Sequence, residues 1–474
     1  MAIVQRKLGF VAIVPAVLLF CSGMGYAVTI WYVDADAPAG GDGTSWATAF
    51  DTIQEAIDAV WGPWVVCTAP NHQIWVRKGT YTLTSQINVN AVVSLYGGFD
   101  GSETSLSQRD WESNTTTIHG NDSVRCLNIT SYCVINGFTI RDGNATTGAG
   151  INIDGVLIHC TMGGGYMSPA ISNCTIRNNV ASTAGGGIYI LDSDPTISNC
   201  IFSSNESDTG GAIYHLTSSP TIRQCIFRNN ESTAPGSLGG GAIGGFSRNF
   251  TSGTLITITN CLFYNNTSGS WGGAISYNQV YPTITNCTIS SNTADIAGGA
   301  FHGNSHSEAP KIHNTICWGN SPDELDIVTS NTYLDVSYCD IEGGWTGAGS
   351  NNIDADPDFS GTTNFRLTLS SPCIDTASNG YGPDEDLENR SRPRDGDSDG
   401  TATCDMGAYE FTRGDFRADG IVDLEDFAVF AAAWDTSIGE PHWNARCDIS
   451  VPRDNKIKLS DFVVFAMQWL VGAE

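Results

Sequence analysis

The fold is decided by a repeat that reads PAISNCTIRNN (169–179), PTISNCIFSSN (195–205) and PTIRQCIFRNN (220–230). Further copies read LITITNCLFYNN (255–266), PTITNCTISSN (282–292) and PKIHNTICWGN (310–320), the last with Thr315 in place of cysteine. The repeat recurs about every 25 residues and carries no heptads, which is typical of a solenoid.

The pattern inside each copy indicates which solenoid it is. Short runs of period two are separated by single bend residues, so we expect strands that turn corners and add one rung per coil to three parallel sheets. Nothing between the rungs has helical periodicity, and this excludes leucine-rich and ankyrin repeats. The body is therefore predicted to be an all-β parallel β-helix.

Two columns of residues follow from the register of the copies. An asparagine five residues after each aligned cysteine predicts a hydrogen-bonded ladder at a bend, because asparagine tolerates a left-handed backbone there. The cysteines should point inward together, which suits a buried column better than disulfides or a metal–thiolate site. The ladder would comprise Asn179, Asn205, Asn230, Asn266, Asn292 and Asn320, and the thiol column Cys174, Cys200, Cys225, Cys261 and Cys287.

The N-terminus has the features of an export signal. Arg6 and Lys7 precede an apolar run, and small residues end at Ala27, so residues 1–27 are expected to be a cleaved signal peptide. The mature chain, without a further apolar stretch of spanning length, is predicted to be secreted or held at the cell surface. A net charge of −28 argues against nucleic acids and anionic membrane surfaces as partners.

The solenoid is expected to begin with a cap. Residues 31–60 predict a strand, a loop and a short amphipathic helix, with Asp51 as N-cap and Ile53, Ala56, Ile57 and Val60 on one face. Such a helix would cover the apolar end of the first coil. We assign residues 28–117 to this cap and the first rungs, and residues 118–345 to the repeats.

Beyond the repeats, a family resemblance appears. The opening WYVDADAPAGGDGTSWATAFDTIQEAI, the stretch YGGFDGSETSLSQRDW (96–111) and the closing SPCIDTAS and CDMGAYEF (within 371–411) resemble bacterial right-handed β-helix proteins of the choice-of-anchor type. This resemblance implies a pectin-lyase-like right-handed β-helix that residues 346–412 close. It implies no particular activity.

Residues 413–474 contain a duplication, since DFAVFAAAW (426–434) matches DFVVFAMQW (461–469). Each copy follows an Asp-rich loop with calcium-ligand spacing, so a small helical domain with two calcium loops is expected. The first loop departs at Arg417, where a ligand belongs, and the second contains a two-residue insertion. The candidate ligands are Asp415, Asp419, the Ile421 carbonyl, Asp423 and Asp426 in the first loop, and Asp448, Ser450, Asp454 and Asp461 in the second.

This module resembles a type I dockerin, which implies a cohesin-type partner on a scaffold or cell surface. The alternative is a helical hairpin without calcium, stabilised by its aromatic residues. A further acidic string, Asp395, Asp397 and Asp399, is either a third calcium site or a solvated loop. Cys373 and Cys404 flank this string and are the candidate disulfide.

No catalytic residues can be assigned from the sequence. Outward positions on successive coils predict a small glycan-contact face, and the alternative is an ordinary solvated face. Two functions stay open: a non-catalytic protein for adhesion or glycan contact, and a tethered polysaccharide lyase or glycoside hydrolase. The glycan-contact candidates are Arg177, Arg228, Glu206, Glu231, Tyr264 and Trp318.

Overall fold

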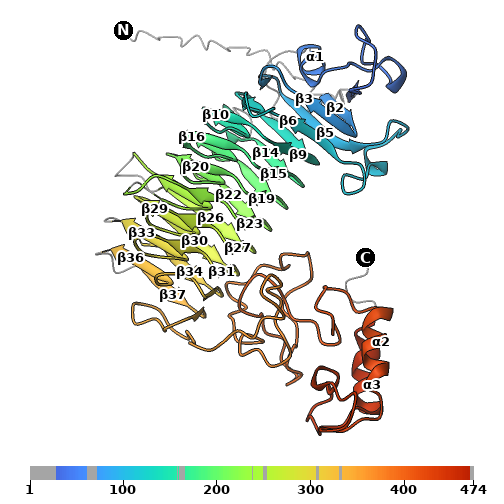
Figure 1. Cartoon of the computed structure of the whole chain (residues 1–474), viewed down its shortest axis with the longest axis vertical. Coiled ribbons are helices and arrows are strands. Elements are labelled where there is room, and N and C mark those ends of the chain that lie inside the picture. Colours follow the sequence, from blue (N-terminus) through green and yellow to red (C-terminus); the bar gives the residue numbers. More distant parts are fainter. Residues whose placement is uncertain are drawn as a thin grey trace, which may run out of the picture.

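The computed structural model describes residues 28–60, 72–156, 158–159, 166–236, 239–248, 254–305, 309–329 and 334–469. The strands stack in register as a parallel β-helix that runs from the blue N-terminal end to the yellow coils of Figure 1. The predicted signal peptide, residues 1–27, lies outside the described residues. No helix in the described part of the chain has the length and apolar character needed to span a membrane.

The longest sheet, sheet A, is parallel throughout and takes one strand from each coil. Its strands are β1 (Thr29–Val33), β2 (His72–Arg77), β5 (Val93–Phe99), β8 (Cys133–Asn136), β14 (Ala170–Ser172), β18 (Thr196–Ser198), β22 (Thr221–Arg223), β26 (Thr254–Thr259), β30 (Val280–Thr285), β34 (Lys311–His313) and β37 (Asp335–Ser337).

Sheet B follows sheet A around a short corner, which in the repeats consists of the aligned cysteine and the residue before it, and contains the strand after each aligned cysteine. Its strands are β3 (Gly79–Thr82), β6 (Thr116–His119), β9 (Phe138–Arg141), β15 (Thr175–Arg177), β19 (Ile201–Ser203), β23 (Ile226–Arg228), β27 (Leu262–Tyr264), β31 (Thr288–Ser290), β35 (Ile316–Trp318) and β38 (Asp340–Ile341).

Sheet C and, in the middle coils, the six-stranded sheet D complete the coils, so the β-helix has four parallel sheets rather than the predicted three. Sheet D is short and lies between the asparagine bend and the glycine turn, where the sequence shows too little alternation to reveal a strand. Its strands are β10 (Asn144–Thr147), β16 (Val180–Ala184), β20 (Glu206–Thr209), β24 (Glu231–Ser232), β28 (Thr267–Ser268) and β32 (Thr293–Ala294).

Sheet C lies between the glycine turn and the return to sheet A. Its strands are β4 (Ile87–Val89), β7 (Leu127–Ile129), β11 (Ile151–Asp154), β17 (Ile188–Leu191), β21 (Ile213–Leu216), β25 (Ile243–Phe246), β29 (Ile275–Asn278), β33 (Phe301–Ser305) and β36 (Leu325–Thr329). A separate antiparallel pair, β12 (Ile158–His159) and β13 (Tyr166–Met167), projects after β11.

The predicted asparagine ladder is confirmed, but the left-handed backbone expected at its members lies one residue earlier, as at Ser204 before Asn205. The side-chain amide of each member donates to the side-chain oxygen of the next, from Asn179 to Asn205 at 3.0 Å and onward to Asn320 at 2.8 Å for the last step. Each side-chain oxygen also accepts the backbone N–H of the preceding member, as in Asn205 to Asn230 at 3.1 Å. The ladder ends where Asn320 donates to the buried Glu324.

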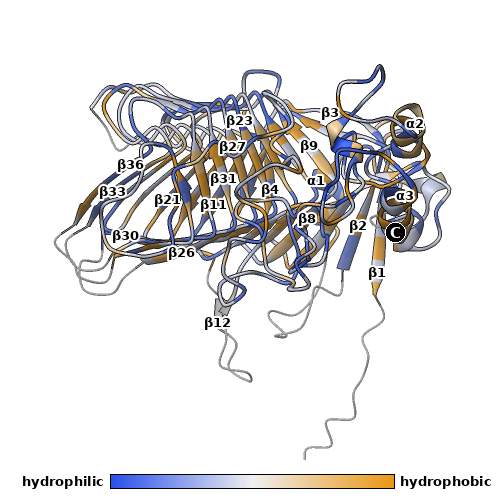
Figure 2. Ribbon diagram, turned by 90° about the horizontal axis from the view of Figure 1, so that it is seen from below, coloured by the Kyte–Doolittle hydropathy of each residue, from blue (hydrophilic) through white to orange (hydrophobic). Residues whose placement is uncertain are grey.

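The aligned cysteines are buried and unbridged, as predicted. Each thiol donates to the carbonyl two residues earlier, as Cys200 does to Ser198 at 3.2 Å. Thr315 makes the same bond with its hydroxyl, to His313 at 2.8 Å, which explains why threonine can replace cysteine in this column. Beside the thiols, the rings of Phe202, Phe227 and Phe263 stack with centroids 4.7 and 4.6 Å apart. Figure 2 shows the hydrophobic residues concentrated on the strands.

The N-terminal helix α1 (Ile53–Asp58) covers the first coils. Ile53, Ala56 and Ile57 are buried in the same core as the rungs, and Val60 packs against it. The helix begins one residue later than predicted: Thr52, not Asp51, is the N-cap, and its hydroxyl accepts the Glu55 N–H at 3.3 Å. Two short 3₁₀ turns, η1 (Trp46–Thr48) and η2 (Leu106–Gln108), lie in the loops of this region.

After β38 the chain is mostly irregular, and then it forms two helices, α2 (Leu424–Ala432) and α3 (Leu459–Met467), with η3 (Ala445–Cys447) between them. Figure 1 shows the orange irregular segment between the last coils and the red helices. The helices pack on each other through the nearly parallel rings of Phe416, Phe430 and Phe465.

Candidate functional sites

The outer face of sheet B carries most of the predicted glycan-contact residues in one column. Arg177, Arg228 and Tyr264 belong to a single in-register row that also contains Arg141 and Ser203. Glu206 and Glu231 pair with each other on sheet D, around the asparagine bend. In the described residues, neither glutamate forms an ion pair with these arginines.

The C-terminal end of this row is covered, which corrects the prediction for Tyr264. Tyr264 is 8% exposed and packs on Phe365, with ring centroids 5.2 Å apart, in a cluster that also contains Leu387 and Tyr409. Trp318 packs partly against a second cluster of the same irregular segment. Both aromatic residues therefore anchor residues 346–412 on sheet B and do not form an open surface.

The covering segment is fixed to the corner between sheets A and B. We name the corner column by its residues, which share a left-handed backbone with φ between 49 and 54°: Asn173, Asn199, Gln224, Asn260, Asn286 and Asn314. Its last four side chains donate to main-chain carbonyls of Asp386, Glu385, Asp405 and Ser378, at 3.0, 2.6, 3.1 and 3.0 Å respectively. This docking cannot be predicted from side-chain identity, because the acceptors are backbone atoms.

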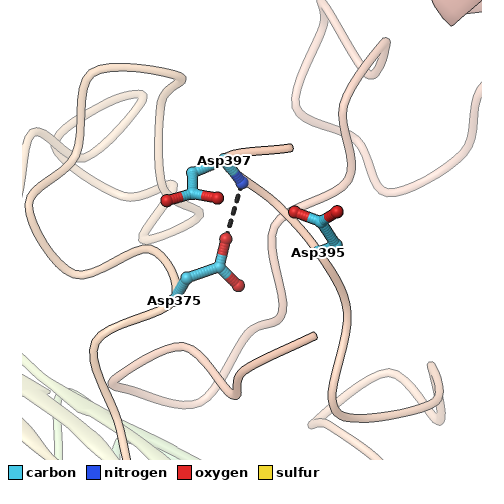
Figure 3. Close-up of side chains that lie close together, drawn as sticks. All are labelled: Asp375, Asp395 and Asp397. Carbon is cyan, nitrogen blue, oxygen red and sulfur yellow. Dashed lines mark hydrogen bonds between the residues drawn. The ribbon is translucent and has the colours of Figure 1, made fainter. Parts of the chain in front are cut away.

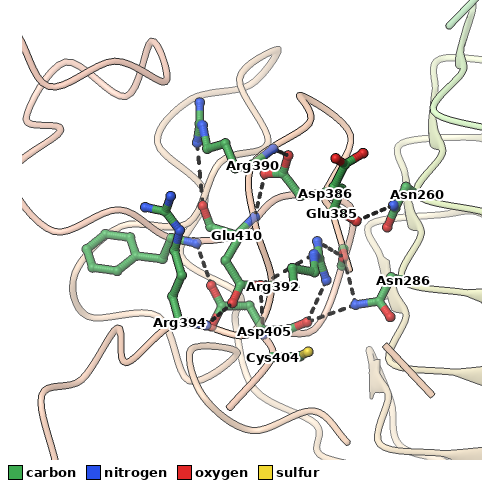
Figure 4. A network of polar contacts seen from close by, with 12 residues as sticks. Asn260, Asn286, Glu385, Asp386, Arg390, Arg392, Arg394, Cys404, Asp405 and Glu410 are labelled. Atoms are coloured by element: carbon green, nitrogen blue, oxygen red, sulfur yellow. Dashed lines mark hydrogen bonds and ion pairs between the residues drawn. The ribbon is translucent and has the colours of Figure 1, made fainter. Parts of the chain in front are cut away.

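Inside the covering segment lies a network of buried charges (Figure 4). Glu410 and Arg392 form an ion pair at 3.4 Å with both side chains fully buried. Burial raises the pKa of Glu410 to about 7. The carboxylates of Asp386, Asp405 and Glu410 mainly accept backbone N–H groups, for example that of Glu410 by Asp386 at 3.0 Å. These charges thus replace the missing sheet bonds of an irregular segment, which is a structural role.

The predicted Cys373–Cys404 disulfide is not formed, since both cysteines are free and buried. The Cys373 thiol donates instead to the Asp340 carboxylate at 3.1 Å. Burial raises the pKa of Asp340 to about 6 and that of Cys404 to about 11. The thiol of Cys373 is thus directed at the last coil of the β-helix and not at Cys404.

The acidic string contributes two of its three members to a cluster (Figure 3). Asp395 and Asp397 meet Asp375, which the sequence reasoning missed, with carboxylate oxygens within 4.8 Å of one another. Asp399 lies outside the cluster and accepts the Thr401 N–H at 2.7 Å. Burial raises the pKa of Asp375 to about 6. Such crowding suits a cation with oxygen ligands.

The first C-terminal loop brings together Asp415, Asp419 and Asp426, with carboxylate oxygens within 4.8 Å of one another. Burial raises the pKa of Asp415 to about 6 and also raises that of Asp426. Asp423 instead caps α2, accepting the Glu425 N–H at 2.8 Å. Arg417, in a ligand position, forms an ion pair with Asp419 at 2.9 Å and so competes with a metal for that carboxylate.

The second loop is assembled around Asp461, which accepts the N–H groups of Ile449 and Ser450 at 2.8 Å each. Asp448 is 2% exposed, and its Oδ1 has no hydrogen-bond partner among the described residues. Asp454 pairs with the Lys458 ammonium. The loop therefore offers one buried free carboxylate oxygen, while an internal cation already neutralises another carboxylate.

An aromatic face on sheet C was not predicted. Its outward residues pack together on three neighbouring strands, and two tyrosine rings lie nearly parallel, 6.0 Å apart at 9°. The face consists of Tyr189, Leu191, Tyr214, Leu216 and Phe246. Burial raises the pKa of Tyr214 to about 12. Period-two alternation could have indicated these outward positions, since Tyr189 and Tyr214 each follow a buried isoleucine.

The same sheet continues into a polar pair. His302 Nδ1 and Asp326 Oδ2 lie 2.8 Å apart on the adjacent strands β33 and β36. The Trp271 ring stacks on His302 with centroids 5.7 Å apart. A carboxylate that holds one ring nitrogen of a histidine orients the other nitrogen, which is the arrangement used for general acid–base chemistry.

Comparison of the sequence with protein families identifies the fold. The chain belongs to the family described as "Right handed beta helix region", whose model matches residues 97–341, so it is a right-handed parallel β-helix protein. No curated protein matches the chain.

Several solved structures are similar to this chain. Three of them are the pectate lyase Pel9A (TM-score 0.46, 13% identity, 82% of this chain and 97% of that chain), a pectin methylesterase from Aspergillus niger (0.30, 16%, 70% and 93%) and a rhamnogalacturonan lyase (0.31, 13%, 70% and 91%).

Proposed function

We propose that this protein is an exported, non-catalytic β-helix that contacts extracellular polysaccharide and is tethered by a calcium-loaded C-terminal module. The observation that carries the glycan contact is the aromatic face of sheet C. Tyr189, Leu191 and Phe246 are partly exposed at outward positions, whereas Tyr214 and Leu216 are buried. Outward positions of a solenoid are normally polar, and apolar side chains that cluster at a surface are typical of a binding site. Tyrosine offers a flat apolar ring with a polar end, which suits the C–H faces and hydroxyls of sugars.

The regular geometry of the sheet favours a polymer as the ligand. Strands of a sheet are about 4.8 Å apart, so equivalent side chains repeat along a straight line over several coils. Beyond Phe246, the row continues with Asn278 and Asn304, whose amides can bond sugar hydroxyls. A linear polysaccharide could thus lie across the coils, contacting rings first and amides next.

The test is retention of the protein on insoluble polysaccharides and in affinity gels that contain soluble ones. We expect Tyr189→Ala and Phe246→Ala to lose retention. Leu255→Ala is the matched control, because Leu255 is an exposed apolar residue (57%) on sheet A. Equal retention of all three variants, or no retention of the wild-type protein on any plant or algal polysaccharide, would refute the glycan contact.

A second candidate function, a polysaccharide lyase or glycoside hydrolase, is favoured by the His302–Asp326 pair alone. In that case the histidine would serve as the acid or base, beside the aromatic face that holds the polymer. Release of soluble sugars from a retained polysaccharide, abolished in His302→Ala and retained in His313→Ala, would replace the non-catalytic proposal. His313 forms a similar pair with Asp335 at 2.9 Å, but on sheet A.

The tether rests on the paired loops. Asp415, Asp419 and Asp426 fit a calcium ion, and the unpartnered oxygen of Asp448 is a further ligand atom in the second loop. The two helices also share an open apolar pocket of about 470 Å³, which suits a protein partner of the cohesin type. The pocket is lined by Phe427, Phe430, Ala431, Trp434, Leu459 and Phe462.

Titration calorimetry with calcium tests the tether. Asp415→Asn should remove the tighter binding event, whereas Asp435→Asn, after α2 and outside both loops, should leave it unchanged. Calcium-dependent comigration with a cohesin module, weakened by Phe462→Ala, would support the partner. Comigration that persists in excess chelator would exclude a calcium-dependent tether.

A further inference from the structure

The outer face of sheet B has an open window between two covered ends. On the N-terminal side, the Arg109 guanidinium covers the corner at Asn136 and donates to the Gly97 carbonyl at 3.0 Å. On the C-terminal side, residues 378–407 cover the corner column from Gln224 onward. Asn173 and Asn199 lie between these ends, Asn199 exposed and Asn173 half-buried.

These two uncovered corner residues have nearly the same backbone conformation as the four corner residues that hold the covering segment. The φ angle is 54° at both, against 49 to 52° at the four corner residues that hold the covering segment. Each occupied amide donates to a main-chain carbonyl of a peptide. The Asn199 amide donates only to Asn173 at 3.2 Å among the described residues, and the Asn173 amide has no acceptor there. Asn173 and Asn199 therefore present side-chain amide donors of the kind that bind main-chain carbonyls on the next coils.

The window is also basic in a strongly acidic chain. Arg177 ends β15, the strand that follows Asn173. Arg223 and Arg228 end β22 and β23 on the coil of Gln224, where the covering segment begins. None of the three forms an ion pair within the described residues, although the chain has 50 acidic residues and 22 Lys and Arg. Arg223 and Arg228 make only single long bonds, to Gln224 at 3.4 Å and to Tyr264 at 3.3 Å. Unpaired guanidinium groups at this density favour carboxylates as ligands.

We propose that this window binds an extended acidic peptide segment of a partner protein. Its main-chain carbonyls would accept from Asn173 and Asn199, and its carboxylates would pair with the three arginines. The neighbouring coils provide the precedent, since the bound segment there includes Glu385 and Asp386. A second copy of the chain does not offer that segment, because it is already docked in its own molecule. This surface is distinct from the aromatic face on sheet C.

The probe is a fluorescein-labelled peptide of residues 381–390, YGPDEDLENR, measured by fluorescence anisotropy against the full chain. Its control replaces each Asp and Glu with Asn and Gln. We expect the acidic peptide to bind and the control peptide to bind at least tenfold less tightly. The Arg177→Ser/Arg228→Ser double variant should lose at least tenfold in affinity. Serine is chosen because Ser203 already occupies the same column.

Two further variants keep the test decisive. Arg248→Ser removes an exposed arginine after β25, at the sheet C side, and should bind the peptide as the wild type does. Asn199→Asp should weaken binding without touching an arginine, and its melting temperature reports whether it folds. Peptide binding that the arginine and Asn199 variants leave unchanged, or no peptide binding, overturns the proposal.

Two other ligands of this window, an acidic polysaccharide and a second copy of the chain, would give different results in these experiments. Arginine-dependent binding of an acidic polysaccharide without binding of the peptide would assign the window to a glycan and overturn the peptide proposal. Sedimentation that shows a dimer, lost in Arg177→Ser/Arg228→Ser, would assign it to a second copy and likewise overturn it. The glycan test on sheet C uses different variants, so either result stands independently.

Discussion

At the scale of single residues, the ladder asparagines illustrate how one amide can fix a whole coil. Asn205 donates to the Ile176 carbonyl at 2.9 Å and to Asn230 at 2.9 Å, and its oxygen accepts both the backbone and side-chain N–H of Asn179. All these groups are buried, and each unpaired buried group costs about 1–3 kcal/mol. The fold therefore needs the hydrogen bonds of the ladder, because each lost bond would leave a buried polar group without a partner.

We therefore expect Asn205→Ala to lower the free energy of unfolding by about 3 kcal/mol or more. Asn199→Ala is the control, because Asn199 also lies at a bend of the coil but its side chain is exposed; its φ is 54°, whereas at the ladder bend the left-handed residue is Ser204 and not Asn205. The control substitution should cost about 1 kcal/mol, the strain of alanine in a left-handed conformation. Urea unfolding followed by circular dichroism measures both, and equal losses would mean that the buried amide bonds of Asn205 stabilise the fold no more than the exposed side chain of Asn199 does.

Glu324, which ends the ladder, makes a pH-dependent contribution. Burial raises its pKa to about 7, although the bonds from Asn320 oppose the shift. The folded protein then holds a proton that the unfolded chain releases near pH 4.5. The stabilisation is complete below that pH and is lost as the pH rises through 7. Glu324→Gln should remove this dependence, so the difference in unfolding free energy between wild type and variant should change between pH 5 and pH 8. A constant difference would contradict the assignment.

At the scale of elements, the inner face of sheet C alternates large and absent side chains. His215 and Tyr277 flank Gly245 in register, and burial lowers the pKa of His215 to about 4, so that it stays neutral in the core. A Cβ at Gly245 would lie 2.2 Å from His215 Nε2 and 2.7 Å from the Tyr277 ring. The missing side chain of Gly245 thus leaves the space that the side chains of His215 and Tyr277 fill.

Gly245→Ala should cost about 1–3 kcal/mol, the usual range for overpacking a core. Combining it with His215→Ala should recover part of that loss, and a double-mutant cycle in urea measures the coupling. Gly361→Ala is the control, since its Cβ would meet nothing closer than 3.7 Å. Additive losses would show that His215 and Gly245 do not compete for the same space.

The elements also show where sequence reasoning succeeds and where it stops. Residues that repeat once per coil, such as Asn205 and Cys200, could be placed at bend and core because the repeat itself supplies the register. Asp375 and the carbonyl of Glu385 could not be placed, since irregular segments have no period and backbone acceptors leave no trace in side-chain identity. The burial of Tyr264 could not be predicted either, because a segment about 100 residues later in the chain covers it.

At the scale of the whole molecule, the acidic charge is divided between two regimes. The β-helix buries carboxylates mainly near its C-terminal end, at Glu324 and Asp340. The segment after β38 buries more of them, and burial raises the pKa values of Asp375 and Asp415 to about 6. Each carboxylate therefore stabilises the metal-free protein most below its unfolded pKa near 3.8. That contribution disappears as the pH rises through about 6, where both groups ionise in the fold.

Calcium should reverse this trend, because it binds the ionised carboxylates that the metal-free fold disfavours. We expect calcium to raise the melting temperature of the C-terminal region strongly at pH 8 and little at pH 5, as measured by scanning calorimetry against a chelator. Magnesium at the same concentration should have a smaller effect, since it prefers a rigid octahedral site. In Asp415→Asn the calcium effect at pH 8 should shrink, whereas a calcium effect equal at both pH values would show that these buried carboxylates are not its ligands.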